Sequence, residues 1–141
     1  MSLVVDASVA IKWFIDESRH EHARYLLETG ETLHAPDLLV PEIGNIAWKK
    51  ATRKEIDPHH AEKITAALRD LPLSLHASQD LIERALRIAL AIQHPVYDCL
   101  YVACAEMLDA TLFTADERLS RALAATSLAG ICRDLSSLER Q

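Results

Sequence analysis

Glycine is scarce in this 141-residue chain, which has only three, at positions 30, 44 and 130. They lie too far apart to build a glycine-rich phosphate-binding loop, which excludes the P-loop and the dinucleotide-binding fingerprint. Long apolar runs are missing too, because the stretch 85–92 is interrupted by Arg87 and a membrane span needs about 20 residues. Asp6 interrupts the apolar run at the N-terminus, so we expect neither a membrane anchor nor a secretory signal.

Cysteine and aromatic residues are also few. Cys99, Cys104 and Cys132 form no Cys-x-x-Cys pair, which favours buried thiols in a reducing compartment over a disulfide framework. Aromatic residues make up 5% of the chain, whereas 50% is hydrophobic and 26% is charged, as in ordinary globular proteins. We therefore expect one cytoplasmic domain that spans residues 1–141.

The chain lacks an excess of positive charge. Its formal net charge is −6, from 21 acidic residues against 15 Lys and Arg. Proteins that coat nucleic acid without specificity are normally basic, so this balance argues against that class. It leaves open an enzyme that meets nucleic acid through bound cations.

Short β-type runs alternate with helical patterns along the chain, which predicts an α/β fold with a mainly parallel sheet. Gly30 is expected to end one helix, and Asp57-Pro58 to begin another. The expected strands cover residues 3–5, 32–35, 73–75, 111–113 and 130–132. The expected helices cover residues 8–14, 20–28, 37–53, 57–71, 80–92, 95–108 and a short segment from 117.

Two acidic residues follow expected strands directly. Asp6 comes after the first apolar run and Asp116 comes shortly after the fourth, each with a hydroxyl residue nearby, Ser8 and Thr114. In open parallel sheets, ligands bind beyond the carboxyl ends of the strands, where the strand order reverses. Each acid also fits a simpler role as a helix cap, and Thr114 to Glu117 is typical of a capping box.

Two further acids, Glu42 and Asp98, lie near the starts of strongly apolar helical segments. Each fits a favourable interaction with the helix dipole, but either can also point into the same crevice as Asp6 and Asp116. Carboxylates 4 Å apart repel by about 4 kcal/mol per pair at an effective dielectric near 20. Divalent cations relieve such repulsion, and an all-oxygen ligand set suits Mg²⁺ or Mn²⁺ better than Zn²⁺.

The four segments that contain these acids together resemble PIN-domain ribonucleases, and more narrowly the toxin subunit of VapBC-type toxin–antitoxin pairs. The resemblance covers essentially the whole chain, with the motifs in the family's order and spacing, although Cys99 stands where the family often has alanine. The motifs are Val5-Asp6-Ala7-Ser8, the segment 35–45 around Glu42, the segment 97–106 that begins Tyr97-Asp98, and Phe113-Thr114-Ala115-Asp116.

The resemblance implies a five-stranded, mainly parallel PIN-like sheet flanked by helices on both faces, and an endoribonuclease that depends on Mg²⁺ or Mn²⁺. It also implies a VapB-like antitoxin partner and a homodimer. By it, the metal-binding and catalytic residues are Asp6, Glu42, Asp98 and Asp116, while Thr114 and Ser8 support them by hydrogen bonds. Glu42 is either a metal ligand or the group that orients or deprotonates the attacking water.

A path for RNA is expected along basic residues near the acids. Asn45, Lys49 and Arg53 lie on the same helical side as Glu42, and Lys12 lies one turn beyond Ser8. Such residues guide phosphates, although a solvated helix face explains them equally well. The alternatives to a toxin nuclease are a non-catalytic RNA-binding or protein-interaction module and a housekeeping RNA-processing nuclease. A signalling receiver and a phosphatase with an Asp-x-Asp motif are disfavoured, because Asp6 has no second acid beside it.

Overall fold

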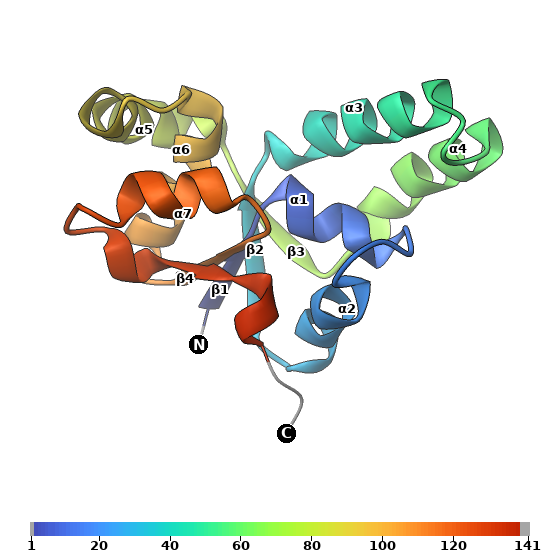
Figure 1. Ribbon diagram of the computed structural model, residues 1–141, viewed down its shortest axis with the longest axis horizontal. Helices are drawn as coiled ribbons and strands as arrows, with labels where there is room; N and C mark the ends of the chain where they lie inside the picture. The colour runs from blue at the N-terminus through green and yellow to red at the C-terminus, as the bar shows by residue number, and fades with distance from the viewer. Residues whose placement is uncertain (1, 139–141) are drawn as a thin grey trace.

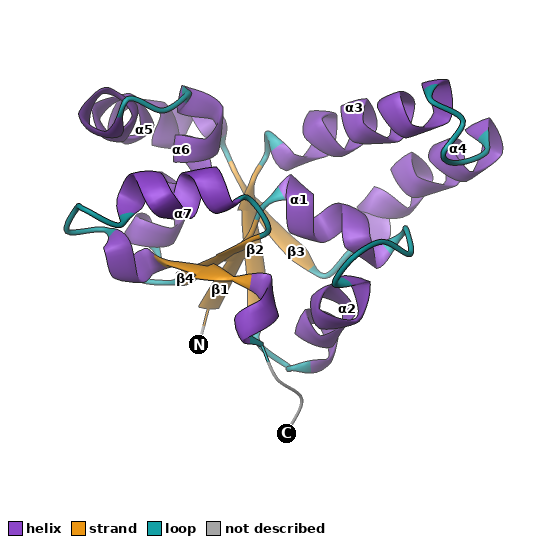
Figure 2. Ribbon diagram, viewed as in Figure 1, coloured by secondary structure: helices purple, strands orange, loops and turns teal. Residues whose placement is uncertain are grey.

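A computed structural model describes residues 2–138 of the chain. Five strands form one sheet in which each neighbouring pair is parallel (Figures 1 and 2), as the alternation of elements predicted. The strand order is β3-β2-β1-β4-β5. The strands are β1 (Ser2–Val5), β2 (Thr32–Pro36), β3 (Leu73–His76), β4 (Thr111–Thr114) and β5 (Cys132–Asp134).

Helices cover both faces of the sheet (Figure 1). The chain runs from β1 to β3 in one direction and then crosses to β4, and right-handed crossovers place the helices of these two halves on opposite faces. One face carries α1 (Ala7–Ala10), α2 (His20–Glu28), α3 (Leu39–Thr52) and α4 (Pro58–Ala67). The other carries α5 (Ser78–Ile92), α6 (Val96–Met107) and α7 (Glu117–Leu123).

The strand order reverses between β1 and β4. β1 continues to β2 on one side, whereas β4, which comes much later in the chain, pairs with it on the other side. The carboxyl ends of β1 and β4 therefore flank the crevice in which parallel α/β sheets bind ligands.

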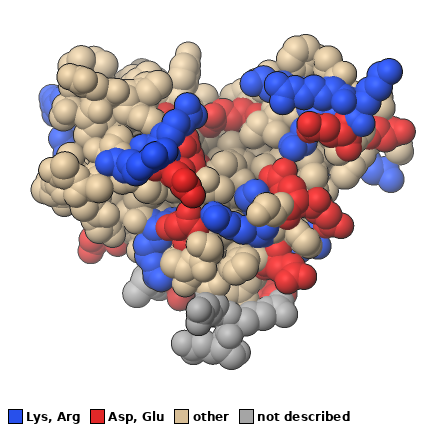
Figure 3. Space-filling view, viewed as in Figure 1, with Lys and Arg blue, Asp and Glu red and all other residues tan. Residues whose placement is uncertain are grey.

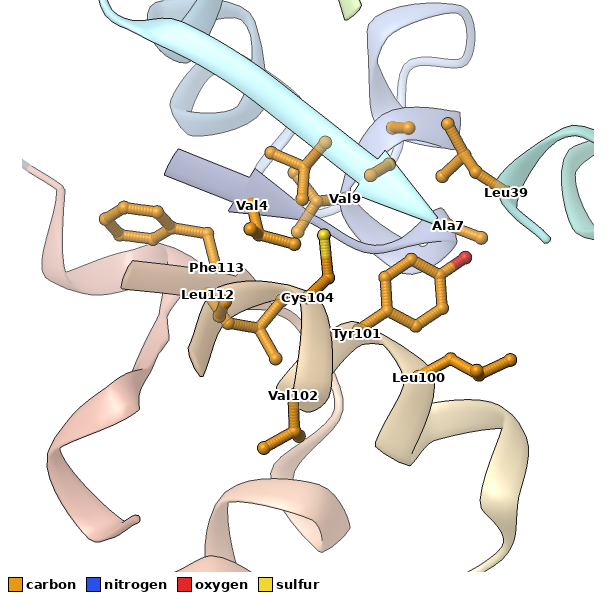
Figure 4. Packing of buried hydrophobic residues seen from close by; sticks show 14 of the residues in the cluster. Val4, Ala7, Val9, Leu39, Leu100, Tyr101, Val102, Cys104, Leu112 and Phe113 are labelled. Carbon is orange, nitrogen blue, oxygen red and sulfur yellow. The ribbon is translucent and has the colours of Figure 1, made fainter. Parts of the chain in front are cut away.

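The hydrophobic core is centred on α6, whose residues 99–105 are all buried. This helix is apolar around its whole circumference because it packs between the sheet and its neighbour α5. Figure 4 shows Cys104 of α6 beside Val4 of β1, with Leu112 of β4 close by. Because α6 is buried at the centre of the fold, the side chains of its first turn are held in place at the edge of the sheet.

Local sequence signals explain several element ends. Gly30, with φ +76°, follows α2 in the left-handed conformation that favours glycine. Asp57 caps α4 through the His59 amide, with Pro58 at the first helical position. The first predicted helix is only partly α-helical, because residues 11–13 form the 3₁₀ turn η1 (Ile11–Trp13).

The predicted position of the fifth strand was wrong by two residues. Residues 129–131 form the 3₁₀ turn η3 (Ala129–Ile131), and β5 pairs Cys132 with Leu112 and Asp134 with Thr114. The remaining 3₁₀ turns are η2 (Leu68–Asp70) and η4 (Leu135–Ser137). Within residues 2–138, no single helix is long and apolar enough to cross a membrane, and α5 and α6 meet that test only as a pair bent by 116°.

Candidate active site

Asp6 lies where β1 ends, beside the last residue of β4. The register pairs Val5 with Phe113, so the next residues along, Asp6 and Thr114, lie side by side. The Thr114 hydroxyl donates a hydrogen bond to Asp6 Oδ2. On the other carboxylate oxygen, Oδ1, Asp6 accepts bonds from Ser8 Oγ at 2.6 Å and from the Val9 amide at 3.1 Å. Asp6 therefore caps α1 and faces the crevice at the same time.

Burial raises the pKa of the Asp6 carboxyl from 3.8 to about 6. The hydrogen bonds from Ser8, Thr114 and Val9 favour the ionised form and hold the increase down, whereas the negative charge of Asp98 adds to it. The influence of Asp98 shows that a second carboxylate lies close to the first. At neutral pH, which is above this pKa, the Asp6 carboxylate therefore carries a negative charge at this edge of the sheet.

Glu42 reaches the same region from the first turn of α3. Its Oε1 accepts a hydrogen bond from the hydroxyl of Tyr101, a fully buried residue of α6. Figure 4 shows the Tyr101 side chain extending from α6 toward Ala7 and Leu39, the first residues of α1 and α3. Burial raises the pKa of Glu42, the Tyr101 hydrogen bond opposes this, and the charge of Asp98 adds to it.

Asp98 is the third residue of α6. Its Oδ2 lies 2.7 Å from Nε2 of His94, in the short turn between α5 and α6. Because the charge of Asp98 raises the pKa values of both Asp6 and Glu42, these three carboxylates form one electrostatic group. The sequence predicted that four acids from two strand ends and two helix starts converge, and this electrostatic group contains three of them without Asp116.

Asp116 lies at the same edge but is held by its own helix. Its Oδ1 accepts a hydrogen bond from the Arg118 amide at 2.9 Å and lies 3.5 Å from Arg118 Nε. The capping residue of α7 is therefore Asp116 and not Thr114, whose hydroxyl accepts from the Asp116 amide at 3.0 Å. Ser8 Oγ similarly accepts from the Ala115 amide at 3.1 Å. These bonds join the loops after β1 and β4.

Three of the four acids keep one carboxylate oxygen without a hydrogen bond, whereas both oxygens of Asp6 accept hydrogen bonds. Glu42 Oε2, Asp98 Oδ1 and Asp116 Oδ2 accept no hydrogen bond from any residue between 2 and 138. As the side chains stand, no three acidic, histidine or cysteine residues of the described chain are close enough together to hold a metal ion. The chemistry of the donor set, hard oxygens that repel one another, nevertheless matches the ligands that Mg²⁺ and Mn²⁺ prefer.

Two of the three basic residues predicted to guide RNA are exposed. Lys49 and Arg53 lie on or just beyond the last turn of α3, where Figure 3 shows Lys and Arg side chains along the rim and acidic side chains in the hollow. Lys12 is different, because its side chain is only 10% exposed and its Nζ lies 3.0 Å from Glu17. Lys50 neutralises the same Glu17 at 3.1 Å. Lys12 is therefore a structural ion-pair residue and is not placed to meet phosphates.

The PIN domain family model matches residues 3–123 of the chain. The sequence is also 33% identical to Ribonuclease VapC3 of Pyrobaculum aerophilum over 122 residues, which are 85% of this chain and 93% of that protein. This chain is a PIN domain of the VapC ribonuclease family. The resemblance inferred from the four acidic motifs is thereby confirmed.

Solved structures share the fold of this PIN domain. The crystal structure of PAE2754 from Pyrobaculum aerophilum covers 97% of this chain and 91% of its own, with a TM-score of 0.68 and 22% identity. A toxin–antitoxin complex from Klebsiella pneumoniae covers 89% of this chain and 93% of its own, with a TM-score of 0.65 and 17% identity. Both likenesses confirm the five-stranded PIN-like architecture.

The side chains of His94 and Tyr101 in this PIN domain hydrogen-bond to the acids although the motifs did not single them out. Tyr101 follows Asp98 by three positions and His94 precedes it by four, the spacings at which helical side chains meet. The helical spacing was therefore a usable signal for His94. No local signal connects Tyr101 with Glu42, because that contact joins residues 59 positions apart.

The metal-free PIN domain should become more stable as the pH falls from 7 to 5. The pKa of Asp6 in the folded chain is about 6, above its ordinary value of 3.8, so between these values the folded state binds more protons than the unfolded state. The free energy of unfolding then rises by about 1 kcal/mol as the pH falls through 6, and the raised pKa of Glu42 acts in the same direction.

Urea unfolding in EDTA at pH 5 and pH 7 measures this effect. The variant Asp6→Asn has no carboxyl to protonate, so its pH dependence over this window should be flatter. The lowered pKa values of Glu17, Glu106 and Asp134 affect stability only below this window. The lowered pKa of His34 opposes the rise inside the window, so the comparison with Asp6→Asn isolates the contribution of Asp6. A native chain whose free energy of unfolding changes with pH no differently from that of Asp6→Asn contradicts the prediction.

Proposed function

We propose that this PIN domain is an endoribonuclease that depends on Mg²⁺ or Mn²⁺ and acts as the toxin of a toxin–antitoxin pair. The observation that carries the proposal is the shared electrostatic environment of Asp6, Glu42 and Asp98 at the carboxyl end of the sheet. In a chain of the VapC ribonuclease family, such a cluster is the expected place for phosphodiester hydrolysis.

Asp6, Glu42, Asp98 and Asp116 are the residues that would hold the cation. A bound divalent ion lowers the pKa of water and polarises the phosphate. Thr114 and Ser8 fix the direction of the Asp6 carboxylate through their hydrogen bonds. Glu42, whose pKa is raised by burial, is suited to orient the attacking water or accept its proton.

The exposed residues of α3 supply the proposed path for RNA. Asn45, Lys49 and Arg53 follow Glu42 at intervals close to whole helical turns, so they continue the same side of the helix away from the acids. Their contacts with phosphates position the strand and bring the scissile bond to the carboxylates. The acidic remainder of the surface limits binding elsewhere.

The double variant Lys49→Ala/Arg53→Ala should bind RNA more weakly, with little change in kcat, the rate at which bound RNA is cleaved. Removing two phosphate contacts raises KM. It also lowers the slope of log KM against the logarithm of the salt concentration by about 1 to 2. Steady-state cleavage of a labelled RNA at several salt concentrations measures both. The matched control is Lys63→Ala/Arg69→Ala, two exposed cations elsewhere on the surface, and equal effects of both pairs contradict the path.

Incubation of the purified chain, free of antitoxin, with total RNA in EDTA, Mg²⁺ or Mn²⁺ tests the proposed activity. Discrete cleavage that requires the metal is the expected result, and the cut sites then identify the RNA. If the folded chain is inactive in every metal, the proposal fails and a non-catalytic module becomes the better interpretation. We place the activity in the cytoplasm, where free cysteines such as Cys99 and Cys104 are usual.

A separate antitoxin chain is the proposed restraining partner, as in the Klebsiella pneumoniae complex that shares the fold. A second copy of this chain is the other proposed partner. Helix α5 exposes Ile82, Leu86 and Leu90 by 41%, 51% and 72%, and their spacing of four residues places them on one face. A two-fold dimer would place this face of one copy against the same face of the other and bury its apolar side chains.

Light scattering coupled to size-exclusion chromatography tests the homodimer. The native chain should have the mass of a dimer, and Leu86→Glu should have the mass of a monomer because it places a charge inside the interface. The control Leu27→Glu, on α2 and 39% exposed, should remain dimeric. A native chain of monomer mass contradicts the homodimer and leaves the α5 face to the antitoxin.

A further inference from the structure

The four acids are held in place in two different ways. Asp6 and Asp116 are helix caps, so main-chain amides fix their carboxylates. Glu42 and Asp98 lie within helices, and among the described residues no main-chain amide binds their carboxylates. Each is held instead by one side-chain donor, the Tyr101 hydroxyl or the His94 ring.

Asp98 has a competing set of donors nearby. Helix α6 begins after Pro95, which supplies no side-chain cap, so the amides of the first helical turn lack a side-chain acceptor. A carboxylate in that turn is attracted to those amides and to the positive end of the helix dipole. The Asp98 side chain is also 34% exposed, so its carboxylate can also turn toward solvent and bind water instead of facing the crevice.

The turn between α5 and α6 is built to present His94 to Asp98. Gln93 has φ +54°, and the His94 amide donates to the Ala89 carbonyl at 3.2 Å, which closes the end of α5. The His94 side chain is only 12% exposed. Its Nε2 lies 2.7 Å from Asp98 Oδ2 and therefore donates to it, while Asp98 Oδ1 accepts no bond from the described residues.

We infer that His94 is a positioning residue that keeps one oxygen of Asp98 engaged and directs the other toward Asp6 and Glu42. It acts as the outer hydrogen-bond donor that orients a ligating carboxylate. The role rests on the proposed function, because it requires Asp98 to hold the divalent cation. His94 itself binds neither the cation nor the RNA.

Titration with Mn²⁺ alone, followed by the electron paramagnetic resonance signal of the free ion, provides a measurement that does not depend on cleavage. His94→Ala should bind Mn²⁺ at least about tenfold more weakly than the native chain. His94→Gln retains an N–H donor and should recover part of the loss. His59→Ala, the same change at a histidine whose side chain is 72% exposed on α4, should match the native chain.

A double variant separates positioning from general damage to the fold. In the Asp98→Asn background, His94→Ala should weaken Mn²⁺ binding by less than about twofold, because its effect passes through Asp98. Additive losses in this cycle show that His94 acts independently of Asp98, and they overturn the inference. All titrations are made below the thermal midpoint of each variant, so that unfolded chain does not enter the comparison.

The outcomes also distinguish this inference from the proposed function. If the native chain binds Mn²⁺ and cuts RNA while His94→Ala stays within twofold of it in affinity, only the role of His94 is overturned. The same holds if His94→Gln recovers nothing, because the donor is then not what matters. If the native chain neither binds Mn²⁺ nor cuts RNA, the proposed function fails, and the role of His94 fails with it.

Discussion

The variant Asp98→Asn should cleave RNA at least about a hundredfold more slowly than the native chain, in Mg²⁺ and in Mn²⁺. The substitution keeps the shape of the side chain and an oxygen that accepts from His94, but it removes the negative charge that faces Asp6 and Glu42. It also removes the repulsion that raises the pKa values of those two residues, so the variant should fold at least as stably in EDTA. Cleavage of a labelled RNA under single-turnover conditions measures the loss.

The matched control is Asp80→Asn. Asp80 is the third residue of α5, as Asp98 is of α6, and it is exposed. The same substitution at the same helical position, away from the crevice, should leave cleavage within twofold of native. If both variants remain fully active, the acids at the sheet edge are structural, and the assignment of Asp98 to the active site is wrong.

Shortening a buried side chain on a central strand should produce the largest loss of stability. Leu112 of β4 has no exposed surface, and β4 lies between β1 and β5. Leu112→Ala should therefore lower the free energy of unfolding by about 2–5 kcal/mol, from lost apolar burial and the cavity left behind. Urea unfolding followed by circular dichroism measures the change.

Leu75→Ala provides the comparison on the edge strand β3. Its side chain is 46% exposed, so less apolar surface is lost and the expected change is about 1 kcal/mol or less. The ratio of the two losses tests the difference in burial between a central and an edge strand. Similar losses in the two variants contradict the burial of Leu112 or the exposure of Leu75.

The sequence predicted the elements that depend on local patterns. Short apolar runs located four of the five strands to within one residue at each end, and the acids after the first and fourth runs predicted the crevice at β1 and β4. β5 was misplaced because an edge strand of three residues is specified by its partner β4 and carries little pattern of its own.

The contacts of individual side chains were less predictable. Lys12 was interpreted as a phosphate contact because its helical position relative to Ser8 faces the site, but the ion pair with Glu17 lies five residues ahead, beyond the end of the 3₁₀ turn. The bond between Tyr101 and Glu42 depends on how the sheet brings α6 and α3, which cover opposite faces, together at its carboxyl edge. Such pairings follow from tertiary packing, which residue spacing along one chain does not describe.

The bond between Thr114 and Asp6 joins residues 108 positions apart, and this has a consequence for synthesis of the chain. A nascent polypeptide that ends before β4 contains Asp6, Glu42 and Asp98 but lacks Asp116 and the Thr114 hydroxyl that binds Asp6. The proposed cutting activity therefore arises only when the last quarter of the chain has been translated and has folded onto the rest. Incomplete products of translation carry three of the four acids, and we expect them to be inert toward the RNA around them.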